Sequence, residues 1–187
     1  MKFDRIDKRI INVLFNNGRE TLSNIAERLI NSKLGAMSHT GIRKRIRKLM
    51  DAGIIKLQGN LNFKRLKYQS AFILMEMKNY DEVRKIINAY SECPRVFLLA
   101  TIAGQYNLIL GVIGQNSEVL QNYINLCGPS NKEGVLHSEI LNISSLETPQ
   151  FLPINIFSYE SQESKCGNIC KKCEALLNGK CEGCGHF

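Results

Sequence analysis

Five cysteines lie close together near the end of the chain, between residues 166 and 184. Four of them form two Cys-x2-Cys pairs, Cys170 with Cys173 and Cys181 with Cys184. Two such pairs can place four thiolates tetrahedrally around one zinc ion, and the glycines beside them permit the tight turns that this requires. We therefore predict a metal site in a small tail, residues 166–187, with these four cysteines as ligands.

The sequence leaves three features of this metal site open. Cys166 or His186 can replace one of the four ligands. Four cysteines can instead hold an iron–sulfur cluster, and clustered thiols can form a redox-responsive disulfide. We favour structural zinc, because four thiolates close the coordination sphere and so short a segment has almost no core of its own.

A second candidate functional feature is the run of positively charged residues that follows Gly41. Aliphatic side chains recur at helical spacing through it, which predicts a helix from about Ser38, the N-cap, to Ala52. Its outward positions hold Arg43, Lys44, Arg45, Arg47 and Lys48. A helix of this width fits the major groove of B-DNA, where base edges present distinct donor and acceptor patterns.

Each polar residue of this helix receives an expected role in DNA binding. N-terminal residues of a recognition helix approach the bases, whereas flanking cations neutralise phosphates. We predict base-edge or nearby phosphate contacts for Ser38, His39, Thr40 and Arg43, and phosphate contacts for Lys44, Arg47 and Lys48. Arg45 is ambiguous between DNA binding and support of the domain core or the dimer.

The net charge of +8 is concentrated in the first third of the chain. Residues 1–67 hold 16 Lys and Arg against 5 Asp and Glu, whereas residues 68–160 hold 5 against 9. A basic unit followed by an acidic one indicates that the first meets a polyanion, here double-stranded DNA.

The pattern around the basic helix predicts a winged helix-turn-helix domain over residues 1–63. Amphipathic helices are expected over residues 4–16 and 22–30, before the basic helix. Residues 54–57 and 61–63 flank Gln58-Gly59-Asn60 and are expected to form a hairpin, the wing.

Beyond a linker at 64–70, the pattern predicts an α+β domain over residues 71–147. Strands are expected at 71–77, 96–102, 106–113 and 135–143, with helices at 81–90 and 117–126. The order βαββαβ is that of the ferredoxin-like fold, in which two helices cover one face of an antiparallel sheet. The other face alternates apolar residues suited to a homodimer contact: Phe72, Leu74, Leu98, Ala100, Ile109 and Gly111. Residues 148–165 are expected to be an arm and linker.

From about Phe3 to Leu146 the sequence resembles the Lrp/AsnC (feast/famine) regulators. The similarity lies in residues 3–11, Asn17-Gly18-Arg19, Ile25-Ala26, and the run 45–49 followed by Gly53-Ile54-Ile55. This resemblance implies a DNA-binding domain joined to a ligand-sensing α+β domain that pairs into dimers and often octamers, with amino acids as common effectors. The cysteine tail is an addition to the usual family plan.

Residues 104–108 resemble the Gly-x-Tyr-Asp-Leu turn of the family. The resemblance implies an effector site at Gly104, Tyr106 and Asn107, and the alternative is a tight turn between strands. Position 107 is Asn where the family usually has Asp, so it offers a neutral hydrogen bond rather than an ion pair to an ammonium group. The turn at 31–37 is also several residues longer than is usual in the family.

These observations together predict a sequence-specific transcription regulator. The alternative is a ligand- or redox-sensing assembly protein that does not bind DNA. We do not expect an enzyme, since none of the three histidines lies beside a nucleophile in a recognised motif and there is no phosphate-binding Gly-rich loop. The longest apolar runs are too short to span a membrane, and the charged N-terminus does not suit a signal peptide, so we expect a cytoplasmic protein.

Overall fold

The computed structural model describes residues 2–154 and 172–181 of the 187-residue chain. It contains two compact units, residues 1–59 and residues 60–187. Within the described residues, no helix is both long and apolar enough to cross a membrane.

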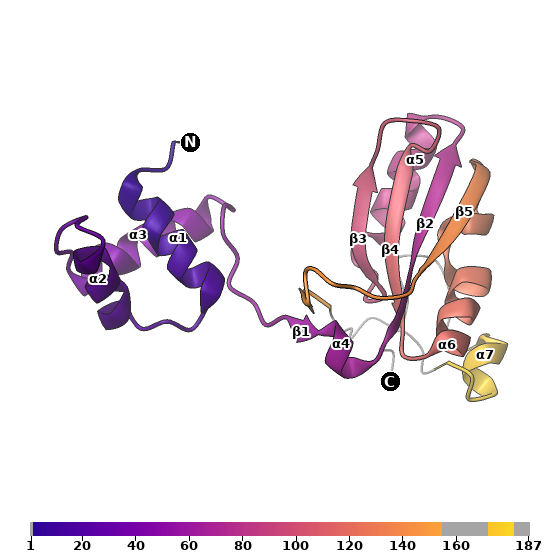
Figure 1. Cartoon of the computed structure of the whole chain (residues 1–187). Coiled ribbons are helices and arrows are strands. Elements are labelled where there is room, and N and C mark those ends of the chain that lie inside the picture. The colour runs from indigo at the N-terminus through magenta and orange to yellow at the C-terminus, as the bar shows by residue number, and fades with distance from the viewer. Residues whose placement is uncertain (1, 155–171, 182–187) are drawn as a thin grey trace. The chain divides into compact units, whose positions relative to one another are not determined.

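The first unit is a bundle of three helices, α1 (Arg5–Asn16), α2 (Leu22–Asn31) and α3 (His39–Asp51) (Figure 1). Each begins at a side chain that accepts a backbone N–H of the first turn, as N-cap residues do: Asp4, Thr21 and Ser38. The buried side chains lie along one face of each helix: Ile10, Val13, Leu14, Ile25, Leu29, Ile42 and Leu49. The three predicted helices are confirmed.

The predicted wing is absent, which corrects the first-domain boundary. Residues 54–60 form no strand, and Leu61–Asn62 (β1) pairs instead with Phe151–Leu152 (β6), antiparallel. This pairing places Leu61 beside the buried Phe63, Leu152 and Ile154 in an apolar cluster of the second unit. A two-stranded hairpin is marginal by itself, so burial against a distant segment of the chain prevails over the local turn.

The main sheet of the second unit has four antiparallel strands in the order β3-β4-β2-β5. They are β2 (Gln69–Met77), β3 (Val96–Thr101), β4 (Leu108–Gly114) and β5 (Val135–Ile143). Helix α5 (Tyr80–Tyr90) connects β2 to β3, and α6 (Ser117–Asn122), extended by a π-helical turn at Tyr123–Cys127, follows β4. A short helix α4 (Phe63–Leu66) precedes β2. This is the predicted βαββαβ arrangement.

Alternate residues of the sheet face opposite sides. Ala71, Ile73 and Met75 of β2 are fully buried and pack with α5 and α6. The intervening Phe72 and Leu74 are only partly buried, although β2 is a central strand. Leu141 on β5 pairs with Phe72, and Leu98 on β3 pairs with Gly111 of β4, so both leucines share the face of Phe72. Their side chains are 44% and 39% exposed. Within the described residues, the middle of this second face is therefore open, whereas its end at Ile113 is covered by Phe63, Leu152 and Ile154.

The described part of the tail is short. Residues 172–181 contain one helical turn, α7 (Glu174–Leu177), which lies beside α6 in Figure 1. Ala175 on α7 is buried.

Candidate nucleic-acid interface

Helix α3 divides its residues between the core and solvent. Ile42 and Leu49 are buried, and successive residues turn by about 100° around the helix axis. The positions farthest from these two are Thr40, Lys44 and Arg47, all of them exposed. They form an outer ridge that ends at Asp51, with Arg43 on one flank and Lys48 on the other.

The first turn of α3 is held by its cap. The hydroxyl of Ser38 accepts the backbone N–H of Gly41 at 3.2 Å. This contact assigns Ser38 a structural role in helix initiation, whereas His39 and Thr40 are exposed beyond it. The backbone turns sharply just before the cap, where Lys33 has φ 56° and Gly35 has φ 90°.

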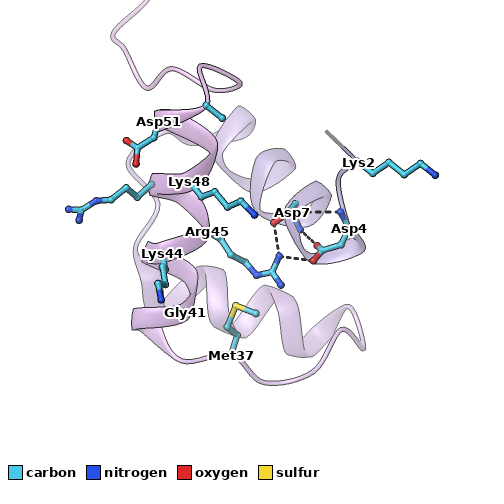
Figure 2. Close-up of a pocket in the computed structure, with 11 residues that line it drawn as sticks. Lys2, Asp4, Asp7, Met37, Gly41, Lys44, Arg45, Lys48 and Asp51 are labelled. Atoms are coloured by element: carbon cyan, nitrogen blue, oxygen red, sulfur yellow. Dashed lines mark hydrogen bonds and ion pairs between the residues drawn. The ribbon is translucent and has the colours of Figure 1, made fainter.

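Arg45 is held by α1 and is the inward-turned cation of α3. One of its terminal nitrogens, Nη1, lies 2.6 Å from Asp4 Oδ2 and 2.7 Å from Asp7 Oδ1 (Figure 2). The two aspartates also form the capping box of α1, in which each side chain accepts the backbone N–H of the other. Arg45 therefore fixes the orientation of α3 against α1.

These contacts shift the acid–base equilibria of the groups involved. The backbone N–H of Asp7, followed by the guanidinium of Arg45, lowers the pKa of Asp4 below 3.8. Hydrogen bonds to Asp7 and Asp4 raise the pKa of Arg45 further above its ordinary value. Both groups stay charged at neutral pH, which preserves the clamp.

An open cleft of about 1060 Å³ lies between the start of α1 and α3. Its lining includes Lys2, Lys44, Arg47 and Lys48, together with the Arg45 clamp (Figure 2). Cations therefore continue from the outer ridge of α3 toward the N-terminal residues. A surface of this kind can hold a phosphate backbone beside a helix that enters a groove.

Comparison with known proteins settles the family. The chain is 33% identical, over 155 residues, to the HTH-type transcriptional regulator FL11 of Pyrococcus horikoshii, covering 81% of this chain and 96% of that protein. The chain belongs to the Lrp/AsnC family of HTH-type transcriptional regulators. It is a DNA-binding transcription regulator, the first of the two predicted functions. No family model matches this regulator.

Solved structures share the fold of this Lrp/AsnC regulator. AsnC of E. coli is 19% identical with a TM-score of 0.66, covering 79% of this chain and 95% of AsnC. A Neisseria meningitidis transcriptional regulator solved as a complex with L-Met is 21% identical with a TM-score of 0.65, covering 77% and 91%.

The predicted effector residues lie at the turn between β3 and β4. The Asn107 side chain accepts the backbone N–H of Met77 and donates to the carbonyl of Met77, both at 2.9 Å. Asn107 therefore holds β2 where its pairing with β5 shifts register between Glu76 and Met77. Gly104 has φ 147°, in the region that favours glycine.

Tyr106 points across the same end of the sheet. Its hydroxyl donates to Glu139 Oε2 at 2.9 Å, and its ring stacks on His137 with centroids 6.0 Å apart. The hydrogen bond to Glu139 raises the pKa of Tyr106 above 10.0. The structure thus brings an aromatic ring and a carboxylate together near the turn.

The predicted metal ligands are only partly described. Cys173 and Cys181 are half-buried, while Cys170 and Cys184 lie outside the described residues, as do Cys166 and His186. Within residues 2–154 and 172–181, no three His, Cys, Asp or Glu side chains come together as a metal site.

Sequence reasoning missed one buried charge near Cys181. Arg95, just before β3, is only 5% exposed. Its Nη2 lies 3.7 Å from the sulfur of Cys181. The two residues are far apart in sequence, so no local pattern could have connected them.

Proposed function

We propose that α3 reads a specific sequence in the major groove of duplex DNA through its N-terminal half and outer ridge. The observation that carries this is the exposed row of Thr40, Lys44 and Arg47 on a helix whose own Arg45 is clamped to α1. Long donors at the centre of the exposed face reach base edges, and cations on the flanks reach phosphates.

This assignment modifies the roles expected from helix position alone. Lys44 and Arg47 lie on the ridge with Thr40, so they face the groove directly, whereas His39 lies nearer the buried side of the helix. Arg43 and Lys48 lie on the two flanks and contact phosphates of opposite strands. Ser38 contributes by capping the helix.

A salt titration of duplex binding tests the proposal. Each phosphate neutralised by Lys or Arg releases counterions, so the logarithm of the binding constant should fall linearly with the logarithm of salt concentration. Specific and scrambled duplexes should show similar slopes and different affinities. Equal affinity for both duplexes at every salt concentration would remove sequence reading from the proposal.

The open middle of the second sheet face supports a homodimer, which higher assembly such as an octamer can extend. Phe72, Leu74 and Ile109 lie on this face in adjacent positions of β2 and β4. Apolar surface of this kind is stabilised by removal from water, and a second copy presents an identical face.

A small amino-acid-like effector is supported by the turn at residues 104–108 and by the L-Met complex of the Neisseria protein. Because Met77 engages both ends of the Asn107 amide, we assign Asn107 the shaping of the site and Tyr106, with Gly104, contact with the effector. A shift in the DNA-binding midpoint on addition of single amino acids tests this assignment, and no shift with any of them contradicts it.

The tail is proposed to bind one structural zinc ion through Cys170, Cys173, Cys181 and Cys184. The support is the spacing of the two Cys-x2-Cys pairs, which suits four thiolates around one zinc ion. An iron–sulfur cluster on the same cysteines is the alternative.

A further inference from the structure

Arg95 is a buried charge at the end of the sheet opposite the β3–β4 turn. It directly precedes β3, and its carbonyl accepts the backbone N–H of Ile113 on β4 at 2.9 Å. A guanidinium that is 5% exposed is costly unless hydrogen bonds replace the water that it has lost. The groups that it meets therefore matter for the fold of this region.

Two of these groups come from different parts of the chain. Nη1 of Arg95 donates to Gln115 Oε1 at 2.9 Å, just beyond β4, and Nη2 donates to Cys181 Sγ at 3.7 Å. The planar fork of arginine allows it to bond both groups at once, which a lysine cannot do with the same geometry. Arg95 thus joins the sheet to residues 172–181, which contain Cys173 and Cys181.

Neighbouring contacts fix the same segment to α6. The side-chain amide of Asn122 donates to the carbonyl of Lys180 at 3.2 Å, and the ammonium of Lys180 lies 3.9 Å from Glu118. Ala175 on α7 is 7% exposed. Residues 172–181 are therefore docked through side-chain, backbone and apolar contacts together.

We propose that Arg95 is the positioning residue that fixes residues 172–181 to the α+β unit, and that it holds Cys181 in place as a ligand of the tail's zinc ion. The second part rests on the proposed zinc site. A zinc-bound thiolate still accepts N–H hydrogen bonds, and four thiolates on one zinc ion carry excess negative charge. The guanidinium of Arg95 offsets that charge at Cys181 and orients the ligand, as partners of metal ligands do.

Zinc retention by the full chain tests this proposal. In Arg95→Gln, zinc affinity measured by competition with a chromogenic chelator should fall about 10- to 100-fold, the usual effect of losing a partner of a ligand. Arg95→Lys should recover part of this loss because it keeps the charge. Arg84→Gln, an exposed arginine of α5, is the matched control and should retain zinc as the wild type does. Equal affinity in Arg95→Gln and the control would overturn the role of Arg95 at the metal.

Tryptic cleavage after Lys180 tests the docking independently of zinc. Cleavage should be several-fold faster in Arg95→Gln than in the wild type, with Arg84→Gln unchanged. Asn122→Ala removes the hydrogen bond to the Lys180 carbonyl without changing the sheet core, so it should also speed cleavage. This variant tests the docking if Arg95→Gln does not fold. A wild type that purifies without metal would overturn the zinc proposal alone, whereas equal cleavage rates in all chains would overturn the docking.

Discussion

Arg45 differs from the other cations of α3 in what its charge does. Arg43, Lys44, Arg47 and Lys48 are exposed, whereas the guanidinium of Arg45 lies against Asp4 and Asp7. The sequence shows five cations on one predicted helix, but it cannot show which of them contacts a carboxylate. The two aspartates that bind Arg45 are 41 and 38 residues away from it in sequence. Helix amphipathicity predicts the exposed face, and only the packed structure assigns roles within it.

The clamp gives a pH-dependent contribution to the stability of the first unit. Because the pKa of Asp4 in the folded chain lies below 3.8, the stabilisation by its carboxylate is complete above that value. It is lost as the pH falls through the folded-state pKa. In Asp4→Asn, the melting temperature should therefore fall less steeply than in the wild type between about pH 4 and pH 2. Circular dichroism melts at successive pH values measure this.

The control for this prediction is Asp51→Asn. Asp51 is exposed at the end of α3, outside the Arg45 clamp. Its substitution removes one carboxylate from the same unit without removing a partner of Arg45. Wild-type acid sensitivity in Asp4→Asn would show that the clamp does not contribute to stability.

Substitutions on the ridge and on the flank of α3 should affect DNA binding differently. Arg47→Ala should weaken binding to the preferred duplex by about 1–3 kcal/mol and relax sequence preference, because a ridge donor contacts a base edge. Arg43→Ala should weaken binding to all duplexes alike and reduce the salt slope by about 1, because a flank cation contacts phosphate. Fluorescence anisotropy with specific and scrambled duplexes distinguishes the two.

Lys85→Ala is the matched control for loss of one positive charge. Lys85 lies on α5 in the other unit and pairs with Glu82 at 2.8 Å, so its removal should leave DNA affinity unchanged. If Arg43→Ala and Arg47→Ala also bind as the wild type does, α3 does not form the interface.

For the helices and strands, the spacing of apolar residues predicted most of the fold. It failed where a strand pairs with a segment that is distant in sequence. The three helices and the four strands of the α+β unit follow from apolar spacing within each segment. The wing failed because Leu61–Asn62 pairs with Phe151–Leu152, a partner that no local turn signal reveals. The predicted arm at 148–165 likewise includes β6, whose Leu152 is buried.

The uncovered face of the sheet should hold two chains together. Leu98 is 39% exposed on the edge strand β3, opposite Gly111 of β4. Leu98→Glu would place a carboxylate in an apolar interface, which is costly without a partner, and should shift the full chain toward monomer. Sedimentation velocity at micromolar concentration measures the change.

Tyr80→Glu provides the comparison for the sheet face. Tyr80 is 67% exposed at the start of α5 and lies outside the sheet. A carboxylate at a helix N-terminus is favourable, so this variant should keep the wild-type oligomeric state. A wild type that sediments as a monomer would exclude the proposed dimer directly.

For the whole molecule, the charge distribution follows the division into two units. The excess of basic residues lies in the unit that carries α3, where 13 Lys and Arg stand against 5 Asp and Glu, whereas the unit that carries the sheet holds 12 of each. Because the second unit carries no net positive charge, it adds little nonspecific attraction to the phosphates of DNA. The composition of the chain predicted this division before any contact was known.

The last prediction concerns the metal and its separation from DNA binding. Protein purified without oxygen and without chelators should contain about one zinc ion per chain, since two Cys-x2-Cys pairs supply four thiolates for one closed site. Cys173→Ser should lower this content, whereas Cys93→Ser should not, because Cys93 packs beside the core of the α+β unit. If the protein contains iron and acid-labile sulfide, the cysteines hold a cluster instead of zinc. If it contains no metal, both forms of the site are contradicted.

DNA affinity should survive the loss of zinc, since α3 is held by the core of its own unit and by the Arg45 clamp. If Cys173→Ser abolishes DNA binding in a chain that is still a dimer, the tail is regulatory rather than structural.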